Sequence, residues 1–70
     1  MSSLIQGRTY ESQGFATNKF PVPQGTKLVY DGHNHSVLLD VFFHEFHFVD
    51  DPSKRIGLSE KEILGKIGGL

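Results

Sequence analysis

The stretch 26-TKLVYDGHNHSVLLDVFFHEFHFVD-50 decides the fold, because it combines strand-forming residues with a strong turn signal. Asp31-Gly32 favours a tight turn, since glycine reaches positive φ at little cost and aspartate tolerates it. A loop of two residues (31–32) or of four (31–34) would pair residues 26–30 with the segment that follows. In either case Leu28 and Tyr30 share a face with odd-numbered apolar positions, namely Val37, Leu39, Val41 and Phe43. The pattern predicts a β-hairpin over about 26–50.

The second half of this hairpin is too long to stay straight. A regular strand over 36–49 would extend about 46 Å, so it must bend, carry a bulge or protrude. The apolar positions are odd-numbered as far as Phe43 and even-numbered afterwards, and a bulge near 43–45 would restore a single apolar face. A helix over 36–49 is the alternative, because several apolar residues also form a helical stripe. The Phe and Val content and the preceding turn favour the strand.

The segment 58-LSEKEILGKIGGL-70 carries the clearest helix signal. Ser59 followed by Glu62 is a capping box, and Leu58 and Ile63 occupy the positions of a hydrophobic staple. We therefore expect a short helix over about 59–67, stopped by Gly68-Gly69.

The first 25 residues are polar and lack a strong pattern. They predict a partly extended N-terminal segment, with a short strand over 3–10 and an extended connector over 20–23, where two prolines exclude helix. A loop is expected from Asp51-Pro52 past Arg55. The whole chain, 1–70, is expected to form a single small α+β domain: a small antiparallel sheet built on the long hairpin, with one C-terminal helix.

Length and charge restrict the function classes. A chain of 70 residues buries little core, and without cysteine it has no disulfides, so metal binding or self-association would be the usual support. The formal net charge of −1 offers no electrostatic footprint for nucleic acid. No segment approaches the roughly 20 apolar residues of a membrane span. We expect a cytoplasmic protein that binds neither nucleic acid nor membrane.

Histidines supply the candidate metal ligands: His33, His35, His44 and His47. Together with Asp40 or Glu45, they would suit zinc or another divalent transition metal without any thiolate. On a strand, however, His44 and His47 point to opposite faces, so the four converge only with a bulge or in a helix. Ordinary surface or hydrogen-bonded histidines are the alternative.

Aromatic density predicts a protein interface. A hairpin and one helix can cover only one sheet face, so Phe42, Phe46 and Phe48 are expected to form an exposed patch if the strand is regular. If the strand bulges, or if residues 1–25 fold over that face, these phenylalanines are core. Leu70, behind two glycines, is a further candidate contact.

These observations favour a small non-enzymatic protein-interaction module, such as a regulator, inhibitor or assembly subunit, which forms a homodimer. The sequence has neither a nucleophile elbow nor a phosphate-binding loop, so no enzyme class is indicated. A histidine-ligated metal protein with simple metal-assisted chemistry is the alternative. An enzyme subunit that needs a partner chain stays open as well.

Overall fold

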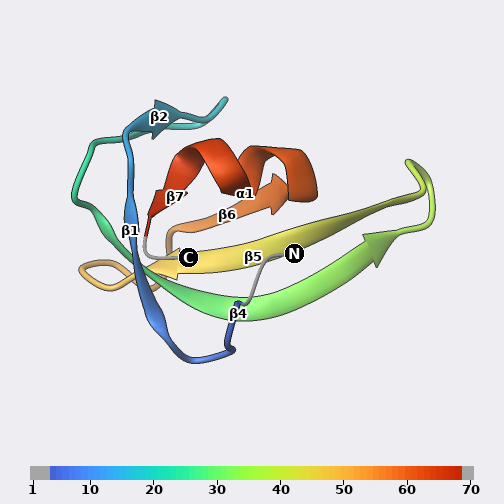
Figure 1. The fold of residues 1–70 in the computed structure, drawn as a ribbon, viewed down its shortest axis with the longest axis horizontal. Coiled ribbons are helices and arrows are strands. Elements are labelled where there is room, and N and C mark those ends of the chain that lie inside the picture. Colours follow the sequence, from blue (N-terminus) through green and yellow to red (C-terminus); the bar gives the residue numbers. More distant parts are fainter. Residues whose placement is uncertain (1–3, 69–70) are drawn as a thin grey trace.

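The computed structural model describes residues 4–68 and has an α+β architecture (Figure 1). A five-stranded antiparallel sheet has the order β6-β5-β4-β1-β7, and a two-stranded ribbon pairs β2 with β3. The strands are β1 (Thr9–Ser12), β2 (Phe15–Ala16), β3 (Pro21–Val22), β4 (Lys27–Ser36), β5 (Val41–Phe48), β6 (Arg55–Ser59) and β7 (Ile67–Gly68); the helix is α1 (Glu60–Lys66). The predicted fold class, a sheet built on a long hairpin with one short C-terminal helix, is confirmed.

The hairpin forms from β4 and β5, but its turn lies at 37–40 rather than at Asp31-Gly32. The Asp40 N–H donates to the Ser36 carbonyl at 2.7 Å, and Asp40 takes the left-handed conformation at φ 53°. Asp is one of the few residues besides glycine that tolerates this region. The prediction of the turn position was therefore wrong, and the interpretation of 36–49 as a helix is excluded because β5 is a strand.

The Asp31-Gly32 dipeptide instead forms a bulge inside β4. The register shifts between Tyr30 and Gly32, where Gly32 has φ +114°. A residue with a side chain would be strained there, which explains the glycine. A bulge was predicted, but on the other strand, near 43–45.

In this register the side chains of β5 that share a face with Leu28 and Tyr30 are the even-numbered ones, not the odd-numbered ones that were predicted. Leu28 lies opposite Phe48, and Tyr30 lies opposite Phe46. The even-numbered residues of β5 therefore share the core face with Leu28 and Tyr30, and the odd-numbered positions point away. The physical reason is that two large aromatic residues become buried against apolar partners, which a turn at 31–32 would have prevented.

Helix α1 begins as predicted but ends differently. Ser59 is its N-cap, and Glu62 Oε1 accepts the Ser59 backbone N–H at 3.0 Å in the capping box. The helix ends because Ile67 turns extended and pairs with Ser12 in the sheet, before the predicted glycine stop. Gly69 lies outside the described residues.

The remaining segments form more sheet than expected. The N-terminal strand occupies 9–12 rather than 3–10, and the proline segment contributes the short β3 at Pro21–Val22. Residues 55–59, expected as a loop and the start of the helix, form β6 along β5. Their alternating burial, with Ile56 and Leu58 inward, is typical of a half-buried strand.

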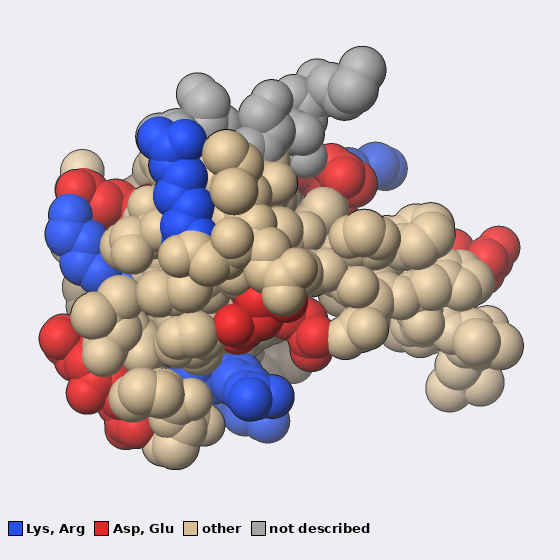
Figure 2. Space-filling view, turned by 90° about the horizontal axis from the view of Figure 1, so that it is seen from below, with Lys and Arg blue, Asp and Glu red and all other residues tan. Residues whose placement is uncertain are grey.

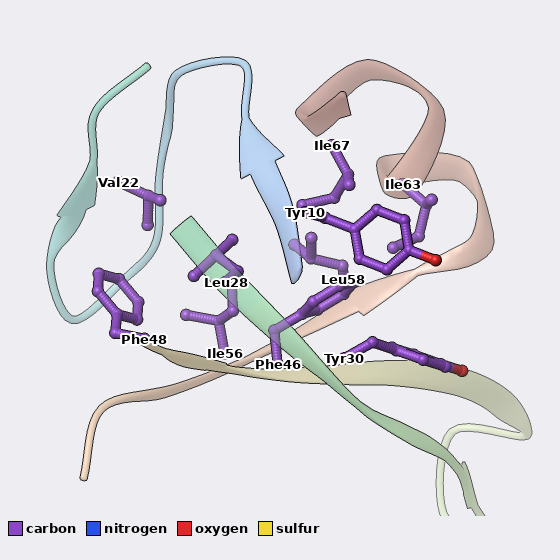
Figure 3. Packing of buried hydrophobic residues seen from close by; sticks show 10 residues of the cluster. All are labelled: Tyr10, Val22, Leu28, Tyr30, Phe46, Phe48, Ile56, Leu58, Ile63 and Ile67. Atoms are coloured by element: carbon purple, nitrogen blue, oxygen red, sulfur yellow. The ribbon is translucent and has the colours of Figure 1, made fainter. Parts of the chain in front are cut away.

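One apolar cluster lies between the sheet, the helix and the β2–β3 region (Figure 3). Ile63 and Ile67 reach it from the C-terminal segment, and Val22 reaches it from β3 close to Phe48. Tyr10 meets the ring of Phe46 edge-on, with centroids 6.4 Å apart. The N-terminal region thus helps to cover the aromatic face of the hairpin.

Candidate functional site

A chain of hydrogen bonds joins three side chains from three separate elements. The Tyr30 hydroxyl on β4 lies 2.8 Å from Nδ1 of His44 on β5, and His44 Nε2 lies 2.8 Å from Oε1 of Glu60 on α1. His44 is only 7% exposed, whereas the Glu60 side chain is 62% exposed. The chain therefore leads from the core to the surface.

The chemistry of the groups fixes the direction of these bonds. The Glu60 carboxylate can only accept, so Nε2 of His44 carries the hydrogen and donates it. In a neutral imidazole the other nitrogen is then an acceptor, and Tyr30 donates to it. When His44 takes up a second proton, Nδ1 becomes a donor and the Tyr30 hydrogen must turn elsewhere.

Burial raises the pKa of the Tyr30 phenol, and the nearby Glu60 carboxylate and Tyr10 raise it further. An ionised phenolate would lose its hydration in the core and be repelled by the carboxylate. Tyr30 is therefore a hydrogen-bond donor at neutral pH rather than a nucleophile.

A hollow of about 370 Å³ lies over this chain of hydrogen bonds. Its lining comes from the segment before β1, from both hairpin strands and from α1, and it consists of Leu4, Tyr30, His33, Phe42, His44 and Glu60. A second hollow, of about 440 Å³, runs along β1 between Arg8 and Gln13. It contains no histidine, so the candidate chemistry lies in the first.

The four predicted metal ligands do not gather at one place. His33 and His44 are cross-strand partners with ring centroids 6.3 Å apart. His35 bonds to Asp40 at 3.1 Å and stacks near Phe42. His47 lies beside Val29 in the register, on the opposite face from His44, and contacts Asp31 at 2.8 Å.

Between residues 4 and 68, no group of three His, Asp or Glu side chains is arranged to hold a metal ion. Glu45, the other suggested carboxylate, accepts a hydrogen bond from Asn34. The metal site stays a prediction.

The predicted interface residues separate between core and surface. Phe46 is fully buried and Phe48 is 9% exposed, so the expectation of one exposed patch is corrected. Phe42 remains 52% exposed, because it lies beyond the end of β6 where nothing described covers it fully. Leu70 lies outside the described residues.

Two members of the site were missed by sequence reasoning. Tyr30 was assigned only to packing, and Glu60 was not singled out within the expected helix. Tyr30 and His44 lie on the same face of the sheet only in the observed hairpin register. The bulge at Asp31-Gly32 and the turn at 37–40 set that register, and neither was predicted. Glu60 reaches His44 because β6 runs beside β5 before α1 starts, and that pairing has no local sequence signal.

The one helix that the described residues form is too short to cross a membrane. Comparisons with protein-family models, with curated proteins and with solved structures found no match to this chain.

Proposed function

We propose that this chain is a small non-enzymatic protein-interaction module, a regulator or assembly subunit, which self-associates through the end of its long hairpin. Residues 33–42, called the arm below, run past the other elements in Figure 1. The observation that carries the proposal is the concentration of exposed apolar side chains there.

The turn of the arm presents three aliphatic side chains to solvent. Val37 is 87% exposed, Leu38 93% and Leu39 63%. Phe42 and Val41 extend this apolar surface toward the body of the protein. Isolated exposed apolar residues are ordinary, but a contiguous group of this kind is typical of a binding surface.

Charge is nearly absent from the arm. Asp40 is its one residue among Lys, Arg, Asp and Glu. Figure 2 shows the projecting lobe as mostly uncharged, whereas both signs of charge lie over the body. Depletion of charge at the centre of a patch distinguishes interfaces from the remaining surface.

The strands of the arm also have open edges. Pairing of β1 with β4 stops at Val29, and pairing of β6 with β5 starts at Phe43. Within the described part of the chain, therefore, residues 32–36 of β4 pair with β5 alone, and residues 41–42 of β5 pair with β4 alone. A two-stranded ribbon is marginally stable alone, and its unpaired backbone groups favour pairing with another strand.

A second copy of the chain is the partner that these features favour. A net charge of −1 gives little repulsion between copies. Two arms related by a two-fold axis place antiparallel strands beside each other, and the apolar tip of each then lies along the arm of its partner. A cytoplasmic location remains part of the proposal, and a chain without cysteine is compatible with a reducing compartment.

The test is sedimentation equilibrium of the full chain over a wide concentration range, with Leu38→Gln and the control Leu64→Gln. Leu64 is 70% exposed on α1, away from the arm, so it matches Leu38 in residue type and exposure. We expect the wild type and Leu64→Gln to self-associate equally. Loss of a leucine from both sides of the interface should weaken association of Leu38→Gln about tenfold or more.

Two outcomes would contradict the proposal. One is a wild-type monomer at high micromolar concentration. The other is an association constant that changes equally in the two variants, because self-association would then not involve the arm.

A further inference from the structure

The hollow beside His44 combines aromatic rings with a single carboxylate. We infer that it binds an organic ammonium group, such as a quaternary or methylated amine. This inference goes beyond self-association and does not depend on it.

Four of the six lining residues contribute rings: Tyr30, His33, Phe42 and His44. The centroids of His33 and Phe42 are 5.7 Å apart at 65°, and those of His33 and His44 are 6.3 Å apart at 57°. The rings are therefore inclined to one another and are not stacked, and all four border the same hollow. They come from both strands of the hairpin, so the antiparallel register holds them in place.

Aromatic faces attract a cation through the negative charge density above the ring, and sites for quaternary ammonium are built from several such rings. A quaternary ammonium has no N–H to donate, so aromatic faces and a nearby negative charge must hold it. The hollow, at about 370 Å³, is within the usual range for small-ligand sites. Leu4 adds an apolar surface for the methyl groups.

The charge of the lining matches this ligand. Among the lining residues that lie within 4–68, Glu60 is the one carboxylate, and none is Lys or Arg. The hydrogen bond from His44 Nε2 holds this carboxylate beside the rings at 2.8 Å from the imidazole. Tyr30 donates inward to His44, and its raised pKa keeps the phenol neutral rather than anionic.

The test is an NMR titration of the isotope-labelled full chain with choline and with 3,3-dimethylbutanol, its neutral analogue of the same shape. We expect choline to shift the resonances of the lining residues with a dissociation constant on the order of 1 mM. The neutral analogue should cause no comparable shift. Equal binding of both compounds, or binding of neither choline nor the peptide below, would overturn the inference.

A short peptide with trimethyllysine distinguishes the two sources of such a group. If the peptide binds much more tightly than choline, the ligand is a modified protein side chain; if choline binds at least as well, it is a free small amine. Either result supports the ammonium site.

Two variants, each of which removes one carboxylate, test whether the negative charge that attracts choline is that of Glu60. Glu60→Gln keeps an acceptor for His44 but removes the charge, and should weaken choline binding about threefold or more. Glu11→Gln removes a carboxylate of similar exposure on β1 and should leave binding unchanged. Equal effects of both variants would mean that only overall charge matters, which would refute the site. Sedimentation of the same samples reports self-association separately.

Discussion

Replacement of Phe46 by alanine tests whether the even-numbered residues of β5 form the core. Phe46 is fully buried and contacts the rings of Tyr10 and Tyr30, the second with centroids 5.3 Å apart. Truncation of a buried phenylalanine costs about 3–5 kcal/mol, from lost transfer free energy and the cavity left behind. A chain of 70 residues has a free energy of unfolding of about 4–10 kcal/mol. Phe46→Ala should therefore lose most of its stability.

Phe42→Ala is the matched control on the same strand. Its side chain is half exposed, so we expect a loss within about 1 kcal/mol. Urea unfolding followed by circular dichroism measures both, and at a slope of about 1 kcal/mol per molar the midpoints should differ by about 2 M or more. Phe46→Leu supplies a smaller, measurable loss where the alanine variant does not fold.

A loss at Phe46 no larger than that at Phe42 would contradict the burial of Phe46 in the core. Both residues lie on the same face of β5, so the comparison tests how far the core extends along that face.

The remaining predictions concern the helix cap, the hydrogen-bond chain and metal. The hydrogen bond from Lys66, followed by that from the Ser59 backbone, lowers the pKa of Glu62 in the folded protein below its ordinary value of 4.5. The ionised Glu62 side chain therefore stabilises the fold above about pH 4.5, and this stabilisation is lost as the pH falls through the lowered pKa of the folded state. Thermal melts should show the advantage of wild type over Glu62→Gln shrinking across that range, and an advantage constant with pH would contradict this. Tyr30→Phe leaves Nδ1 of buried His44 without its donor and should cost about 1–3 kcal/mol in urea unfolding, with a shift of the His44 Nδ1 resonance; an unchanged resonance would exclude the hydrogen bond. If the histidines bind zinc, the metal should raise the melting temperature and a chelator should reverse it, whereas no bound metal by elemental analysis and no shift would end that hypothesis.

The fold class was predictable because the signals for its strands and its helix are local, so each depends only on residues that are neighbours in the sequence. The capping box of Ser59 and Glu62 places the start of α1, and it needs no information from the remaining chain. Strand character around Leu28 was likewise indicated by composition, which also favoured a strand over the alternative helix for 36–49.

Pairing over longer distances was not predictable in the same way. Asp31-Gly32 suits a hairpin turn and a bulge equally well, since both need positive φ at glycine. What selects the bulge is the burial of Phe46 and Phe48 against Tyr30 and Leu28, which appears only when the two strands are aligned. The candidate site depends on this register, so the partnership of Tyr30 with His44 was missed.

Sheet content outside the hairpin has the same origin. Arg55–Ser59 has only two inward apolar residues, which is a weak strand signal. The segment forms a strand because its backbone pairs with the edge of β5 that β4 does not cover. Ile67 and Gly68, which follow α1 and form β7, pair with β1 because the docking of α1 on the sheet brings them to the free edge of β1.

The most direct test of self-association through the arm is an isotope-filtered NMR experiment on a mixture of labelled and unlabelled chains. It detects only contacts between copies. We predict intermolecular contacts from the methyl groups of Val37, Leu38 and Leu39 to the arm of a second copy. The proposed function would be contradicted if the intermolecular contacts arose from Leu64 or Ile5 instead. It would also be contradicted if no intermolecular contact were detected at millimolar concentration.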